Sequence, residues 1–113
     1  MTLQKKLKLI RDTLVGLNLN AYHYYNAKPK LPYVVWAEDS EGDSFYAGNH
    51  KAEQVIHGTI DYYTKTEFDS NADAIQGALN ALPIGWKLNS VQYEEETNLI
   101  HYEWEFEIGE VTD

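Results

Sequence analysis

The 113-residue sequence predicts a single α+β domain: a mainly antiparallel sheet of about five strands, with two helices packed on one face and a long β-hairpin at the end of the chain. Three observations lead to this fold class. Two segments carry apolar residues at helical spacing, and the last strand alternates apolar and polar residues with a period of two. The 43% hydrophobic content supplies one core for a chain of this length. We expect residues 1–113 to form one domain without a linker.

Two helices are expected, at about residues 2–17 and about residues 70–82. Thr2 is the expected N-cap of the first helix, and Ser70, with Asp73 three residues on, is that of the second. Pro83 prevents the second helix from continuing. The first apolar stripe consists of Leu3, Leu7, Ile10, Leu14 and Leu17, and the second of Ala72, Ile75, Ala78, Leu79 and Leu82.

The strands are expected at Ala21–Asn26, Tyr33–Ala37 and Glu53–Thr66, and in a hairpin from Trp86 to Ile108 that turns at residues 95–98. Gly58, inside the third of these segments, marks a bulge or a bend. The last strand has the clearest pattern, because its period of two is typical of a half-exposed antiparallel strand. Its apolar face is Ile100, Tyr102, Trp104, Phe106 and Ile108, and its polar face is His101, Glu103, Glu105 and Glu107.

Residues 38–52 are expected to form a long acidic loop. The segment Glu38–Ser44 is polar and contains Gly42, and a loop of this length in a small domain is often functional or mobile. Residues 39–43 resemble a calcium loop but fail its pattern. The glycine comes too early, and no bidentate glutamate follows at the required distance. A solvated acidic loop is therefore expected.

The net charge of −9 is unevenly distributed along the chain. Residues 1–30 hold six basic side chains and one acid, giving +5, whereas residues 31–113 hold three basic side chains and seventeen acids, giving −14. The acidic body should repel a nucleic-acid backbone. The basic end either docks on an acidic surface, such as that of a neighbouring copy, or only solvates one helix face. The candidate basic docking face is Lys5, Lys6, Lys8 and Arg11.

The sequence gives no positive evidence for an enzyme, a cofactor or a metal site. The chain has no cysteine, and no two histidines have the spacing of a helical metal pair. Glu103, Glu105 and Glu107 stand roughly 6.5–7 Å apart along one strand face, near the separation of an inverting pair of carboxylates. A catalytic pair also needs a cleft that raises one pKa, which an open strand face does not supply. Those three carboxylates instead suggest a surface that meets solvent, basic groups or the lumen of a channel.

No signal peptide is visible in the sequence, and no stretch approaches the roughly 20 apolar residues of a membrane span. A protein made in a cytoplasm, without a membrane partner, is therefore expected.

The chain resembles the tail terminator and tail-completion proteins of long-tailed bacteriophages, especially those of Gram-positive hosts and their prophages. The resemblance covers about residues 3–108 and lies in the order and spacing of the elements. The residues that carry it are the leading amphipathic helix, Leu31–Val35, the acidic loop, Val55–Ile56, Tyr62–Lys65, the helix Asp73–Leu82, Tyr93–Glu95 and Leu99–Trp104.

This resemblance implies a structural virion protein without catalytic residues or a cofactor. Such proteins form a ring, usually a hexamer, and some of these rings form only on the tail tube. The ring ends growth of the tail tube, contacts the tube protein and seats the tail on the head connector. Tail terminator and head-side completion proteins share this fold, and the sequence does not decide between them. DNA passes through the ring without specific binding, so the expected location is the virion neck, after assembly in the host cytoplasm. The loop is the part implied to contact a neighbouring ring, and its candidate residues are Asp39, Glu41, Asp43, Phe45 and Tyr46.

Two alternatives from other classes stay open. One is an acidic DNA mimic or inhibitor that occupies a basic site on a host enzyme, suggested by the carboxylates of the last strand. The other is a small hydrolase that uses Glu103 or Glu105. The polar face of Glu103, Glu105 and Glu107 is thus an interface or lumen surface in the first hypothesis and an active site in the last.

Overall fold

The computed structural model describes residues 1–42, 46–47, 50–51 and 54–110. The elements are α1 (Leu3–Val15), β1 (Asn20–His23), β2 (Tyr33–Glu41), β3 (Tyr46–Ala47), β4 (His50–Lys51), β5 (Ile56–Thr64), α2 (Ser70–Asn80), β6 (Gly85–Glu94) and β7 (Leu99–Ile108). A five-stranded sheet has the order β1-β2-β5-β7-β6, and β3 and β4 pair separately. β1 and β2 are parallel, and every other pair in the sheet is antiparallel.

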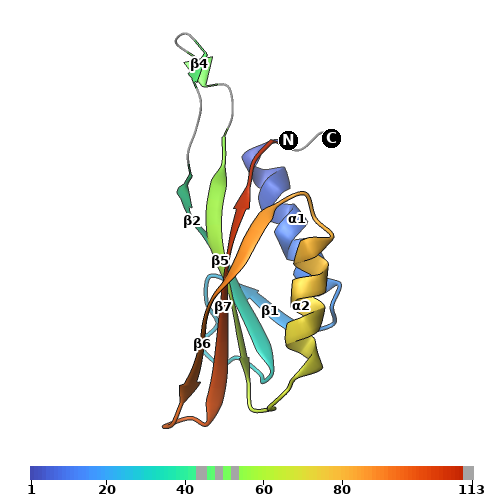
Figure 1. Cartoon of the computed structure of the whole chain (residues 1–113), viewed down its shortest axis with the longest axis vertical. Coiled ribbons are helices and arrows are strands. Elements are labelled where there is room, and N and C mark those ends of the chain that lie inside the picture. Colours follow the sequence, from blue (N-terminus) through green and yellow to red (C-terminus); the bar gives the residue numbers. More distant parts are fainter. Residues whose placement is uncertain (43–45, 48–49, 52–53, 111–113) are drawn as a thin grey trace.

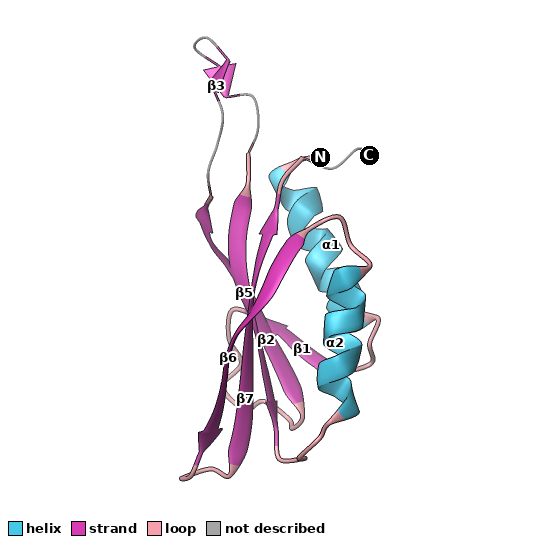
Figure 2. Ribbon diagram, in the orientation of Figure 1, coloured by secondary structure: helices cyan, strands magenta, loops and turns pink. Residues whose placement is uncertain are grey.

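Both helices lie on the same side of the sheet, and the hairpin of β6 and β7 extends toward one end of the molecule (Figures 1 and 2). The predicted α+β class, with its mainly antiparallel sheet and its long C-terminal hairpin, is confirmed. No helix in the described part of the chain is long and apolar enough to cross a membrane.

The helix caps agree with the sequence prediction for α1 and differ for α2. Thr2 Oγ1 accepts a hydrogen bond from the backbone N–H of Lys5, at 3.2 Å. In α2 the N-cap is Asp69, not Ser70, and its carboxylate accepts from the backbone N–H of Asn71 at 2.9 Å. Asp69 takes this position because its backbone is extended, which leaves its side chain free to reach back over the first turn.

The core lies between the helices and the inner face of the sheet. Strand β5 alternates buried and half-buried residues along its whole length. On β7 the predicted apolar face is fully buried at Trp104, Phe106 and Ile108, and half-buried at Ile100 and Tyr102. The remaining buried apolar residues are Leu7, Ile10, Leu14, Val34, Trp36, Ile56, Ile60, Tyr62, Ala72, Ile75 and Leu79.

The long loop predicted for residues 38–52 is wrong at its beginning, because β2 continues to Glu41. This part of β2 pairs with the start of β5, with Glu38 opposite Gly58 and Ser40 opposite His57. The register shift between those two pairs is a bulge, which places the irregularity on β2 rather than at Gly58 itself. Pairing with β5 satisfies the backbone hydrogen bonds of this segment. Its side chains are polar, so the composition alone indicated a loop.

Candidate functional site

The basic face of α1 is smaller than the sequence suggests. Lys5, Lys8 and Arg11 are exposed on the helix, but Lys6 is only 1% exposed and does not belong to this face. Lys6 Nζ donates to the backbone carbonyl of Gln54 at 2.8 Å and lies 3.4 Å from Glu110 Oε1. Lys6 adjoins the apolar stripe, so its stem is buried while its amine reaches a polar partner. Its role is therefore internal, and the "basic face" below means Lys5, Lys8 and Arg11.

The second surface is the side of the sheet opposite the helices, which no described helix covers (Figure 2). We call it the open face. Its acidic side chains come from four neighbouring strands, β2, β5, β6 and β7, and two histidines and a lysine lie among them. The carboxylates are Asp39, Asp61, Glu94, Glu103, Glu105 and Glu107, and the other groups are His57, Lys87 and His101.

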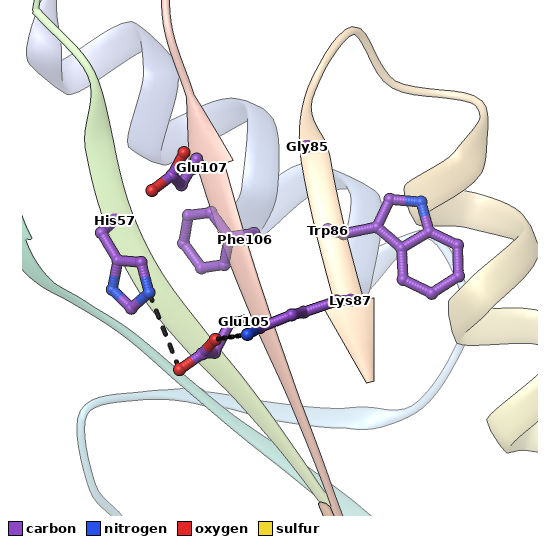
Figure 3. A pocket seen from close by; sticks show the side chains of 7 residues that line it. All are labelled: His57, Gly85, Trp86, Lys87, Glu105, Phe106 and Glu107. Carbon is purple, nitrogen blue, oxygen red and sulfur yellow. Dashed lines mark ion pairs between the residues drawn. The ribbon is translucent and has the colours of Figure 1, made fainter. Parts of the chain in front are cut away.

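One row of charges crosses the open face near the ends of β5 and β7. Asp39 Oδ1 lies 2.7 Å from His57 Nδ1, and His57 Nε2 lies 4.0 Å from Glu105 Oε1. Lys87 Nζ lies 3.3 Å from Glu105 Oε2 (Figure 3). His57 and Lys87 also line a shallow hollow of about 330 Å³, together with Glu107. The hydrogen bond from His57 helps to hold the pKa of Asp39 below its usual value, against the opposing effect of burial.

A second cluster lies farther along the same strands. His101 Nε2 is 2.6 Å from Asp61 Oδ1, and His101 Nδ1 is 3.8 Å from Glu94 Oε1. The Tyr63 ring stacks on the imidazole, with 4.3 Å between centroids. The hydrogen bond with Asp61 raises the pKa of His101, although burial acts in the opposite direction. Donor atoms of Asp61, His101 and Glu103 all lie within 4.8 Å of one another.

The predicted acidic face of β7 exists, but its glutamates are less solvated than expected. Glu103 and Glu105 are half-buried, and Glu107 is exposed. Asn89 Nδ2 donates to Glu103 Oε1 at 2.6 Å, and Glu105 pairs with Lys87. Neighbouring strands thus engage two of the three glutamates, and the described residues around them form a shallow surface rather than an enclosed cleft.

The predicted assembly loop is divided by the structure. Asp39 and Glu41 belong to β2, and Asp39 contacts His57 on the open face. The backbone of Tyr46 is in β3, whereas Asp43 and Phe45 lie outside the described residues.

Sequence reasoning missed Asp61 and its contact with His101. A helical pair of metal ligands is recognised by a spacing of three or four residues, whereas here the pairing of β5 with β7 joins residues 40 positions apart. The sequence holds part of the information, because Asp61 and His101 each lie on the polar face of a strand whose residues alternate between the two faces. The register needed to join them was missing. The expectation of no protein-built metal site was made without these distances.

Comparison with known proteins finds no matching family model and no matching curated protein. The function is therefore inferred from the basic face and the open face, and from where these two surfaces lie on the fold.

Proposed function

We propose that this chain is a structural protein of a long-tailed bacteriophage. Copies of the chain assemble into a ring, and each contact joins two different surfaces of neighbouring copies. In this proposal the ring ends growth of the tail tube at its head-proximal end and joins the tail to the head connector. The ring acts in the virion neck and is assembled in the host cytoplasm. The resemblance in order and spacing of the elements suggests the kind of ring. The observation that carries self-assembly is the position of the two charged surfaces.

The basic face and the open face lie on opposite sides of the sheet. Lys5, Lys8 and Arg11 project from α1, which covers one side, whereas Glu105 and Glu107 belong to the other (Figure 2). The two surfaces of one chain therefore cannot neutralise each other. They can do so between copies, with the basic face of one copy against the open face of the next. Contact between two different patches is heterologous, and repetition of such a contact closes into a ring when the rotation allows it.

Partly desolvated side chains on the open face also suit a contact surface. Tyr33 stacks on Tyr63 with 4.7 Å between ring centroids, and Tyr63 stacks in turn on His101. Tyrosine is enriched at protein interfaces because its ring is apolar and its hydroxyl is polar. Carboxylates of the open face that the neighbour leaves uncovered would repel DNA phosphates, which favours passage of DNA without binding.

Sedimentation of the purified chain over a range of protein and salt concentrations, with electron microscopy of the larger species, tests this proposal. We expect closed rings that dissociate as salt rises from about 0.01 M to about 1 M, because the Debye length falls from about 30 Å to about 3 Å. The variant Lys8→Glu/Arg11→Glu should fail to assemble even at low salt. The matched control Lys28→Glu/Lys30→Glu makes the same change in charge at exposed residues between β1 and β2 and should behave as the unmodified chain. A two-fold symmetric dimer, or association that ignores salt, would contradict the proposal.

The carboxylates of the open face also favour a second candidate, an acidic protein that mimics DNA on a basic site of a host enzyme. This candidate predicts a monomer that binds a DNA-processing enzyme in competition with DNA. Loss of that competition in Glu105→Gln/Glu107→Gln, without self-association of the unmodified chain, would favour it over the ring.

A further inference from the structure

Asp61, His101 and Glu103 form a compact group of two carboxylates and one imidazole on the open face. Asp61 on β5 is directly opposite Glu103 on β7, and His101 lies two residues before Glu103 on the same strand. His101 is 17% exposed and Asp61 is 18% exposed, so solvent reaches the group but does not surround it. One donor atom from each residue lies within 4.8 Å of the other two. Two donors about 2.0–2.2 Å from one ion are at most about 4.4 Å apart, so small side-chain movements would bring all three donors to coordination distance.

The surroundings hold two of these side chains in position. The Tyr63 ring stacks on the imidazole of His101, and Asn89 Nδ2 donates to Glu103 Oε1 at 2.6 Å. While Nε2 of His101 faces Asp61, Nδ1 faces Glu94 Oε1 at 3.8 Å. A carboxylate beside the far nitrogen of a ligating histidine is a common outer contact in metal sites, where it fixes the orientation of the ring.

Charge gives a second, independent reason for a cation. Like charges directly opposite each other on paired strands destabilise a sheet, and Asp61 and Glu103 are such a pair. Glu94 adds a third carboxylate near the same imidazole. One protonated histidine compensates only part of this charge, whereas Lys87, on the neighbouring strand, is paired with Glu105. A divalent ion between Asp61, Glu103 and the neutral imidazole would neutralise both ligating carboxylates.

We propose that Asp61, His101 and Glu103 bind one divalent transition-metal ion, with Zn²⁺ as its representative. The imidazole nitrogen selects this class, because Mg²⁺ and Ca²⁺ prefer ligand sets made of oxygen alone. With three protein ligands, water completes the tetrahedral coordination of zinc. On binding, the ion takes the place of the proton that His101 Nε2 and Asp61 Oδ1 share, this proton passes to solvent, and the two atoms separate from 2.6 Å. The proposal does not depend on assembly into a ring.

Calorimetric titration of the chelator-treated chain with Zn²⁺ tests the site. Co²⁺ serves as a second probe, because its visible absorption reports nitrogen and oxygen coordination. We expect one equivalent of Zn²⁺ to bind, and excess Mg²⁺ not to displace it. His101→Gln, Asp61→Asn and Glu103→Gln should each weaken binding at least about tenfold, the loss seen when even outer contacts of a metal site are removed.

His57→Gln is the matched control. His57 lies on the same face between Asp39 and Glu105 and should leave Zn²⁺ affinity unchanged. The three test substitutions keep side-chain size, and circular dichroism checks that each variant folds, so one unfolded variant leaves two to decide. Absence of saturable Zn²⁺ binding by the unmodified chain overturns the proposal. So does equal affinity in His101→Gln, or equal competition by Mg²⁺, since both indicate diffuse attraction to an acidic surface.

Discussion

Gly58 lies where two neighbours leave no room for a side chain, so Gly58→Ala tests the packing of the sheet. A Cβ at this position would stand 2.4 Å from Phe106 Cζ and 2.5 Å from the backbone oxygen of Ala37. Optimal contact between carbon atoms is about 3.5–4.0 Å, so each neighbour would have to move by about 1 Å. Neither moves easily, because Phe106 is 1% exposed and Ala37 is paired within the sheet.

Overpacking of a core typically costs about 1–3 kcal/mol, and the rigidity of both neighbours places this change near or above about 3 kcal/mol. Urea unfolding followed by circular dichroism measures it. Gly77→Ala is the matched control, because a Cβ there meets nothing within 4 Å and the residue is inside α2. Alanine in a helix interior should stabilise the chain by about 0.5–1 kcal/mol. Unfolding free energies within about 0.5 kcal/mol of each other for the two variants would refute this reasoning.

Substitutions at two residues, the buried Lys6 and the half-buried Asp69, test polar groups beside the core. Lys6→Glu should lower the free energy of unfolding by more than about 3 kcal/mol, because it leaves an uncompensated buried charge near Glu110; near-native stability in urea unfolding would show that Lys6 is not internal. Asp69→Ala should cost about 2–4 kcal/mol, because the cap of α2 and an acceptor for the Thr64 hydroxyl are both lost. Asp69→Asn, which still caps, should cost less. Burial opposes ionisation of Asp69, but its hydrogen bonds prevail and hold its pKa below 3.8 in the folded chain. The ionised carboxylate of Asp69 therefore stabilises the folded chain at pH values above the unfolded pKa, and this contribution is lost as the pH falls through the folded pKa. The loss of unfolding free energy in Asp69→Asn should accordingly shrink in acid. A loss that grows in acid would contradict this sign.

The sequence was sufficient for elements whose pattern is local. The alternation on β7 gave the buried face of Trp104, Phe106 and Ile108, and the two apolar stripes gave both helices within a few residues of their observed ends. These patterns are visible in the sequence because burial of one face of a helix or strand requires apolar residues at the period of that element.

The features that the sequence did not reveal depend on distant partners. In the sequence Lys6 is one more lysine of a helix face, and distant partners, the carbonyl of Gln54 48 positions away and the carboxylate of Glu110, make its burial favourable. The contact of Asp61 with His101 requires the register of β5 on β7. The polar residues at the end of β2 indicate a loop in the sequence, and only their pairing with β5 shows that they form a strand. Composition cannot reveal contacts of this kind, because they follow from strand pairing.

A mixture of two variants with reversed charges most directly tests assembly through contacts between the basic face and the open face. In Lys8→Glu/Arg11→Glu both surfaces are acidic, and in Glu105→Lys/Glu107→Lys the part of the open face around His57 and Lys87 becomes basic like the helix face. Sedimentation at low salt should show that each variant alone fails to assemble, because its two surfaces repel each other. An equal mixture should recover ring-sized species, in which the two variants alternate and every contact joins opposite charges. A mixture that stays as dissociated as its components, or either variant assembling alone like the unmodified chain, would contradict the account.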